Sequence, residues 1–301
     1  MNPRFVLVDV FTETRFGGNP LAVVPDARGL TDAQMQRLAR EINFSESTFV
    51  LPAERGHTRR VRIFTPTREV PFAGHPNVGT AFVLAATGEL GAFGDATRVV
   101  FEEQAGLVPV AIRRRGNGFF CELTAPEPLS LGSPVPAALV ARALSLESSE
   151  VVVAHHPPRV ASVGLPFVIA ELRDRAALER ARIVAEGFDA IAALGVMPDL
   201  HLYVRTGDGF DLRTRMFAPH DGVPEDPATG SANAALAGLL ASLEPGEGLM
   251  RFRIAQGVEM GRPSILEATV ERHAGSEPSI RIGGASVMVA EGRWTLDREG
   301  T

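Results

Sequence analysis

A five-residue pattern that occurs twice, about half a chain apart, most constrains how this chain can fold. Residues 62–66 read RIFTP, and residues 215–219 read RMFAP. After each copy come a proline-containing loop and a turn of small residues, which opens an apolar segment ending near residue 86 or residue 241. These segments are rich in Ala, Gly and Leu, and a helix that is apolar all round is a buried helix. The repetition therefore predicts two similar halves, each built around one buried helix.

Short strands punctuated by turns occupy most of the remaining sequence. Stretches of β-branched or alternating residues predict strands in the first half at residues 5–11, 22–24, 48–51, 60–64, 99–102 and 108–112. An N-cap at residues 30–32 and apolar residues at helical spacing predict one surface helix, and a second is expected over residues 175–186. We predict an α+β fold of two pseudo-symmetric domains, each a mostly antiparallel, barrel-like β-sheet wrapped round a central helix.

The domain boundary is expected where Pro, Ser and Gly concentrate, over residues 123–136. This gives an N-terminal domain of residues 1–125 and a C-terminal domain of residues 126–301, each close to the usual domain size. Residues 283–290 have the composition of a closing strand. The sequence leaves open whether that strand completes the second domain or returns to the first.

Two absences exclude several classes of enzyme. Every basic residue is Arg, and a chain without Lys cannot form the Schiff base of a pyridoxal-phosphate enzyme or aldolase, nor a Walker-type phosphate loop. Cys121 is the single cysteine, which excludes an intrachain disulfide, a Cys-based zinc site and a racemase with two thiols. His155 and His156 lie too close together to make a metal site by themselves. No carboxylate stands at metal-ligand spacing from the other histidines considered, which are His57, His201, His220 and His273. We therefore expect no metal site.

The partners and the location follow from charge and hydropathy. No apolar run approaches the ~20 residues that span a bilayer, and residues 1–9 lead into a strand without the pattern of a signal peptide. The net charge of −6 argues against nucleic acid or an anionic membrane as a partner. We expect a cytoplasmic protein with neither nucleic acid nor a membrane as its partner.

The glycine-rich turns before the two buried helices are the first candidate binding elements. Helix N-termini carry unpaired N–H donors and a partial positive charge, so they bind anions such as a substrate carboxylate. If the halves face each other, the turns at Gly74 and Gly230 would meet in one cleft and could also stabilise an enolate-like intermediate. The alternative is that Gly74 and Gly230 only allow each helix to pack closely and bind no substrate.

Ionisable and polar side chains gather at these turns. His75 follows Gly74, Asp226 precedes the second turn, and Ser231 follows Gly230. Asp226 would also serve as an N-cap, and His75 as a hydrogen-bonded structural histidine. Their occurrence at matching places in two repeats favours a role in function.

Two further polar residues lie at junctions between expected elements. Glu46 stands between Ser45 and Ser47, where hydrogen bonds would hold it, before the strand at residues 48–51. In a cleft shielded from water its pKa would rise, which suits a group that takes and returns a proton, although the sequence equally allows a surface position. Asn19 lies in a Gly-Gly-Asn-Pro turn, from which its amide could reach a cleft or serve the turn alone.

Together, five segments resemble the PhzF family of phenazine-biosynthesis isomerases, which share the diaminopimelate epimerase fold. The matching segments are DVFTETRFGGNPLAVV at 9–24, NFSESTFVLP at 43–52, RIFTPTREVPFAGHPNVGTA at 62–81, PEDPATGSANAALAGLL at 224–240 and QGVEMGRPS at 256–264. They are spread over most of the chain, in the expected order, and are specific as a set.

The resemblance implies two pseudo-symmetric domains with the active site between them, a homodimer and no cofactor. It implies that the carboxylate of Glu46 shuttles a proton and that His75 and Asp226 lie in the site. The residues implied to contact the substrate are Asn19, Gly74, Gly230 and Ser231. Related epimerases use a cysteine at each of these turns, and this chain has neither, so it resembles the isomerase branch.

We therefore expect a cofactor-independent isomerase that shifts a proton on a small carboxylate-bearing substrate by general acid/base catalysis. The phenazine enzyme moves a proton between ring carbons of trans-2,3-dihydro-3-hydroxyanthranilate, but the resemblance predicts the reaction class rather than this substrate. A racemase or epimerase of an amino acid-like substrate is an alternative, with Asp226 or His75 as the second acid/base group. A small-molecule binding protein without catalysis is the other.

Overall fold

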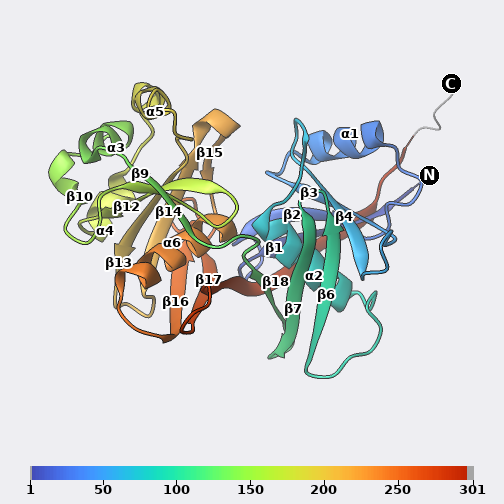
Figure 1. The fold of residues 1–301 in the computed structure, drawn as a ribbon. Coiled ribbons are helices and arrows are strands. Elements are labelled where there is room, and N and C mark those ends of the chain that lie inside the picture. Colours follow the sequence, from blue (N-terminus) through green and yellow to red (C-terminus); the bar gives the residue numbers. More distant parts are fainter. Residues whose placement is uncertain (1, 297–301) are drawn as a thin grey trace. The chain divides into compact units, whose positions relative to one another are not determined.

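A computed structural model describes residues 2–296 and shows two compact units. Unit 1 comprises Met1–Thr124 and Gly283–Thr301, and unit 2 comprises Ala125–Ile282. The chain thus passes into unit 2 one residue before the expected boundary after residue 125. It returns to unit 1 at Gly283, so the last strand completes the first unit, the alternative that the sequence left open (Figure 1).

Unit 1 is a closed barrel around a buried helix. Its strands are β1 (Arg4–Val10), β2 (Asn19–Val24), β3 (Ser47–Leu51), β4 (Arg59–Phe64), β5 (Glu69–Val70), β6 (Ala96–Glu103), β7 (Gly106–Arg115), β8 (Gly118–Thr124) and the part of β18 (Ser279–Arg293) from Gly283 onward. Each strand pairs with the next in the order β1–β2–β3–β4–β6–β7–β8–β18, and β18 pairs back with β1. Helix α2 (Gly74–Ala86) is buried along almost its whole length and packs against strands around the barrel, as Figure 1 shows.

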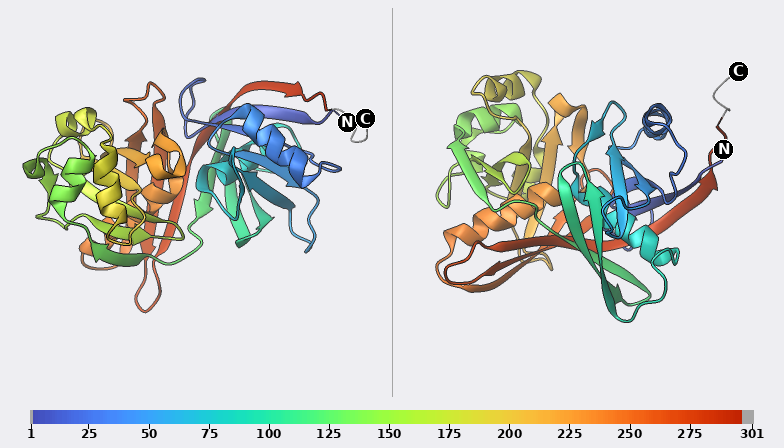
Figure 2. Two further views of the ribbon diagram at one scale, coloured as in Figure 1. Left: turned by 90° about the horizontal axis from the view of Figure 1, so that it is seen from above. Right: turned by 45° about the vertical axis from the view of Figure 1, so that its right-hand side comes forward.

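The surface helix α1 (Asp32–Ile42) packs on the outer face of the same barrel, against β3 and β4. Thr31 and Gln34 form a capping box, and Asn43 ends the helix in the left-handed conformation. The apolar residues Met35 and Leu38 join a core cluster, which confirms the helix predicted from their spacing (Figure 2).

Unit 2 has a sheet in the order β9–β11–β12–β13–β14–β16–β17, with β10 beside β12 and β15 beside β14. These strands are β9 (Ser130–Pro134), β10 (Val151–Val152), β11 (Arg159–Ser162), β12 (Pro166–Leu172), β13 (Leu200–Arg205), β14 (Leu212–Ala218), β15 (Val223–Asp226), β16 (Gly248–Gln256) and β17 (Ser264–Arg272). The buried helix α6 (Gly230–Leu243) packs against several of them. The 3-10 turns Ser148–Glu150 and Pro219–Asp221 complete the connections.

Three short helices of unit 2 form a further core layer with β12 and β13: α3 (Ala137–Ala143), α4 (Arg175–Arg180) and α5 (Ala185–Ala192). The expected single helix over residues 175–186 is wrong, because α4 ends at Arg180. The N–H groups of Arg182 and Val184 instead donate to the carbonyls of Leu144 and Ala143, both at 2.9 Å, and this holds the chain extended between α4 and α5. No helix within residues 2–296 has the length and apolar character needed to cross a bilayer.

The two units repeat one topology, which confirms the internal repeat. β2–β3 and β12–β13 are parallel pairs, and so are β4–β6 and β14–β16. The arginine of each repeated pattern makes the same bidentate ion pair. Arg62 donates to Glu69 at 2.7 and 2.6 Å, and Arg215 donates to Glu225 at 2.8 and 2.9 Å.

Candidate active site

The start of α2 is the first element of the candidate site. Gly74 is the first residue of the helix and His75 the second. The N-cap residue Ala73 makes no side-chain hydrogen bond to the first turn, and that turn contains no acidic residue. The positive end of the helix dipole is thus not offset by a side chain of its own first turn, which leaves it suited to an anion.

Three of the predicted residues meet at this turn. The His75 Nε2 atom lies 3.8 Å from Oε2 of Glu46, and the His75 ring is 6% exposed. On its other side, Nδ1 of His75 lies 3.4 Å from the amide nitrogen of Asn19, which is fully buried. A carboxyl, an imidazole and an amide therefore lie in a row at the N-terminus of α2.

The alternation of β3 explains why Glu46 faces the helix. Successive side chains of a strand point to opposite faces. Thr48 bonds to Thr80 of α2 at 2.9 Å, while Phe49 packs on the other face with α1. Glu46 stands two residues before Thr48 and so lies on the α2 side.

The Glu46 carboxyl is partly shielded from solvent. Its side chain is 21% exposed, so it is shielded but not sealed. Burial raises the pKa of this carboxyl, and the interaction with the Ser45 side chain opposes that rise. The expectation that both flanking serines hold Glu46 by hydrogen bonds is wrong, because the hydroxyls of Ser45 and Ser47 are buried and neither makes a hydrogen bond of standard geometry with a described residue.

The predicted residues of the second half lie at the corresponding turn of unit 2. Gly230 is the first residue of α6, and Ser231, the second, is partly exposed. Asp226 ends β15 and accepts a 2.5 Å hydrogen bond from the hydroxyl of Thr229. The N-cap is Thr229, so Asp226 is not itself the cap.

Strand register reveals a carboxyl that the motifs missed. The first residue of β3 lies opposite Phe64 of RIFTP, and the first residue of β13 lies opposite Phe217 of RMFAP. The residues just before them, Glu46 and Asp199, therefore occupy equivalent positions. Asp199 is 7% exposed, and burial, with a smaller effect from the charge of Asp221, raises its pKa to about 7. Carrying the spacing between Glu46 and the first pattern over to the second would have found it.

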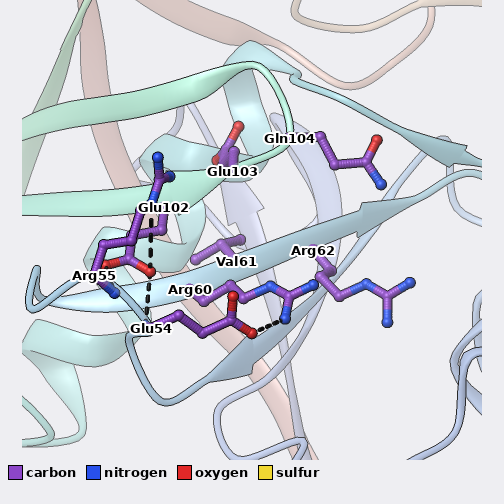
Figure 3. Close-up of a pocket in the computed structure, with 8 residues that line it drawn as sticks. All are labelled: Glu54, Arg55, Arg60, Val61, Arg62, Glu102, Glu103 and Gln104. Carbon is purple, nitrogen blue, oxygen red and sulfur yellow. Dashed lines mark hydrogen bonds and ion pairs between the residues drawn. The ribbon is translucent and has the colours of Figure 1, made fainter.

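A cavity of about 320 Å³ in unit 1 contains none of the predicted site residues (Figure 3). Two of its guanidinium groups are already paired, Arg60 with Glu54 and Arg62 with Glu69. Its lining residues are Glu54, Arg55, Arg60, Val61, Arg62, Glu102, Glu103 and Gln104. Within residues 2–296, no group of three or more His, Cys, Asp or Glu side chains is placed to hold a metal ion.

Comparison with known proteins identifies the family. The family model for phenazine biosynthesis-like proteins (PhzC-PhzF) matches residues 8–292. The chain belongs to the PhzF family. It is 39% identical over 293 residues to the trans-2,3-dihydro-3-hydroxyanthranilate isomerase of Pseudomonas aeruginosa, covering 96% of this chain and 98% of that protein. It is also 39% identical over 300 residues to an uncharacterized isomerase of Mesorhizobium japonicum, with the same coverage.

Solved structures agree with this assignment. A PhzF-family phenazine biosynthesis protein of Bacillus anthracis has a TM-score of 0.88 and 26% identity, over 98% of this chain and all of that one. A hydroxyproline epimerase of Agrobacterium vitis has a TM-score of 0.65 at 16% identity, over 99% of this chain and 94% of that one, which shows a shared fold. The predicted resemblance, the fold class and the assignment as an isomerase of the PhzF family are confirmed.

Proposed function

We propose that this PhzF-family isomerase shifts a proton on a small carboxylate-bearing substrate and that Glu46 carries the proton. The observation that supports this most is the row of Glu46, His75 and Asn19 at the start of α2. General acid/base catalysis works best when the pKa of the group lies near the working pH. Burial raises the pKa of Glu46 above the ordinary value for a glutamate, toward neutral pH.

The proposed reaction needs one carboxyl in two protonation states. The Glu46 carboxylate removes a proton from a carbon next to a double bond, and the C–H electron pair enters the π system. The resulting carboxylic acid returns the proton to another carbon of that system, so the double bond moves. The carboxylate is then regenerated, and no electrons are gained or lost overall.

The neighbours of Glu46 have supporting roles in this proposal. The amide of Asn19 fixes the ring of His75 through Nδ1, and Nε2 of His75 faces the carboxyl. The first-turn N–H groups of α2, beginning at Gly74, bind the carboxylate of the substrate and offset negative charge in the intermediate.

We propose that the corresponding turn of unit 2 also takes part. Ser231 and the backbone of Gly230 would bind substrate, and the Asp226 carboxyl would relay or stabilise charge. Support comes from their place in the repeat, since Gly230 opens α6 as Gly74 opens α2. The hydrogen bond from Thr229 fixes the Asp226 carboxyl beside this turn.

The substrate to test first is trans-2,3-dihydro-3-hydroxyanthranilate, the compound named for the Pseudomonas relatives at 39% and 37% identity. NMR in deuterated buffer follows both the rearrangement and the entry of solvent deuterium at carbon. We expect Glu46→Gln to lower the rate by roughly 10²-fold or more, the usual scale for loss of a general acid/base. Glu41→Gln, a change at an exposed glutamate of α1, is the matched control and should leave the rate unchanged.

The outcomes separate the parts of the proposal. A Glu46→Gln variant that rearranges substrate and incorporates deuterium at the normal rate would exclude Glu46 as the carrier. Inversion at one carbon without movement of a double bond would indicate an epimerase instead. Full activity after dialysis against a chelator, with no cofactor added, is expected for the cofactor-independent reaction.

We also propose that the protein is a homodimer, as the resemblance to the PhzF family implies. Light scattering after size-exclusion chromatography would then give twice the chain mass of 32.1 kDa. A mass of one chain at micromolar concentration would contradict this.

A further inference from the structure

Glu103 is a buried carboxyl that the proposed reaction does not use. In unit 1, Arg60 of β4 lies opposite Glu102 of β6, and in unit 2 the equivalent pair is Arg213 and Ala255. The next residue along the second strand is Glu103 in unit 1 and glutamine in unit 2. The two units thus place an acid and its amide at the same point of the repeated fold.

The glutamine of unit 2, Gln256, ties down the start of α6. Its side-chain oxygen accepts from the N–H of Thr229 at 3.1 Å and from the amide of Asn233 at 2.7 Å. Its NH2 group donates to the carbonyl of Asp226 at 2.8 Å and to the hydroxyl of Thr229 at 3.0 Å. To hold the start of α6 in this way, one side chain must supply both a hydrogen-bond acceptor and a hydrogen-bond donor.

Unit 1 repeats the helix side of that arrangement. Asn77 donates to the carbonyl of Ala73 at 2.9 Å, as Asn233 does to Thr229, also at 2.9 Å. The Asn77 side chain also interacts with the Glu103 carboxyl, where it opposes the rise in pKa that burial causes. A neutral carboxylic acid offers one acceptor and one donor, as an amide does, whereas a carboxylate offers acceptors only.

The adjacent residue, Glu102, shows why Glu103 differs. Its carboxylate accepts from the N–H groups of Glu54, Arg55 and His57, and these bonds hold its pKa below the ordinary value despite burial. Glu103 points away from Glu102, to the opposite face of β6 (Figure 3), where Asn77 of α2 interacts with its carboxyl. There it is 8% exposed, neither oxygen makes a hydrogen bond of standard geometry with a described residue, and burial raises its pKa to about 8.

Other charges line the adjacent cavity but are already matched. Arg60 pairs with Glu54, and Arg55 lies 4.0 Å from Glu102. Arg62, the third guanidinium, pairs with Glu69. On the helix side, the titratable group of the first turn is His75. None of these groups provides Glu103 with an ion pair in the described part of the chain.

We propose that Glu103 is kept as a neutral carboxylic acid and positions the first turn of α2, which carries His75, as Gln256 positions the first turn of α6. Ionisation of Glu103 removes the donor and loosens this turn. Glu103 is a positioning residue, since it acts through the helix and not on the substrate. Only its consequence for catalysis rests on the proposed function.

Carbon-13 NMR tests the protonation state without any substrate. In protein labelled at the side-chain carboxyl carbons of glutamate, each carboxyl signal is followed from pH 4 to pH 10. We expect one signal to titrate near pH 8, about tenfold more protonated than ionised at pH 7, and to be absent from Glu103→Gln. The signal of Glu46, the other glutamate whose pKa burial raises, is assigned by its absence from Glu46→Gln. A Glu103 signal that titrates below pH 5 would overturn the proposal.

The ring signals of His75 test the positioning role, again without substrate. In the wild type they should shift as Glu103 ionises near pH 8, and in Glu103→Gln this step should disappear. Glu103→Ala, which leaves neither donor nor acceptor, should show displaced His75 signals at every pH. If the His75 signals do not change over the pH range in which Glu103 ionises, the positioning role is excluded. This holds even if the carbon-13 experiment shows that Glu103 is neutral at pH 7. Because no turnover is measured, neither result depends on the proposed reaction.

Discussion

Replacing Glu103 by glutamine should stabilise unit 1 in a way that depends on pH. Burial raises the pKa of this carboxyl in the folded protein, so the folded state holds a proton that the unfolded state has already released. Unfolding therefore becomes easier as pH rises between the unfolded value, 4.5, and the folded value, about 8. Glutamine has no such proton, and the variant escapes this loss.

The size of the effect follows from the same two values. A tenfold change in proton affinity is worth about 1.36 kcal/mol. The free energy of unfolding of Glu103→Gln, relative to the wild type, should therefore gain roughly 3 kcal/mol between pH 4.5 and pH 7. Above pH 8 the gain should level off at about 4 to 5 kcal/mol, or somewhat less if water reaches the ionised carboxyl.

The single tryptophan makes the measurement specific for unit 1. Trp294 packs against Phe5, with the rings tilted and their centroids 4.9 Å apart, beside the core that α1 covers. Urea unfolding followed by its fluorescence, repeated from pH 5 to pH 9, gives the free energy for the unit that contains Glu103. Glu102→Gln is the matched control of opposite sign. Its pKa is lowered in the fold, so that variant should lose stability at neutral pH and approach the wild type as pH falls below about 4.5.

A difference between Glu103→Gln and wild type that is the same at pH 5 and pH 8.5 would refute this reasoning. It would mean that Glu103 has the same protonation state in the folded and unfolded protein. The correspondence with Gln256 would then be one of position only.

Three further experiments test other parts of the fold. Gly18→Ala should lower the free energy of unfolding in urea by more than about 2 kcal/mol, because a Cβ there would lie 2.3 Å from the carbonyl oxygen of Val10. The matched control is Gly56→Ala, which is also at positive φ but would have no atom within 4 Å of its Cβ. It should lower the free energy of unfolding by only about 1 kcal/mol. Cys121 should react with a thiol reagent only after unfolding, because it is fully buried and burial raises the pKa of its thiol. If Cys121 in the folded protein reacts as fast as an exposed thiol, this expectation is wrong. The free energy of unfolding of Asp199→Asn, relative to wild type, should increase by roughly 3 kcal/mol between pH 4 and pH 7. The reason is that the folded wild type, with the pKa of Asp199 raised to about 7, loses stability over that range. A difference between variant and wild type that does not change with pH would show that Asp199 is ionised throughout.

Much of this fold could be predicted because it rests on repetition and periodicity. The apolar segments that follow RIFTP and RMFAP are the two buried helices, and α1 lies where its cap and spacing predicted. The break between α4 and α5 could not be predicted in this way. It depends on backbone bonds to Ala143 and Leu144, which lie far away in the sequence, and the helix-forming composition of residues 175–186 gives no sign of them.

The site was predictable where a motif coincides with a helix start. Asn19, Glu46 and His75 come together at α2 because the turn, the strand junction and the helix each have a local sequence signal. Asp199 and Glu103 have no such signal. Each is one acidic residue beside or at a strand end, and it stands out only when its spacing from the repeated pattern, which strand register explains, is compared between the two units.

The comparison of equivalent positions separates residues that maintain the fold from residues that do chemistry. Both units keep the arginine–glutamate pair beside the repeated pattern, so that pair belongs to the scaffold. The units differ at these positions: unit 2 has Ser231 where unit 1 has His75, and by strand register Leu165 takes the position of Asn19. Leucine has no amide with which to fix an imidazole, so Ser231→His would not by itself recreate the row of unit 1. The proton carrier proposed here is therefore Glu46, whose unit supplies both neighbours, rather than its counterpart Asp199.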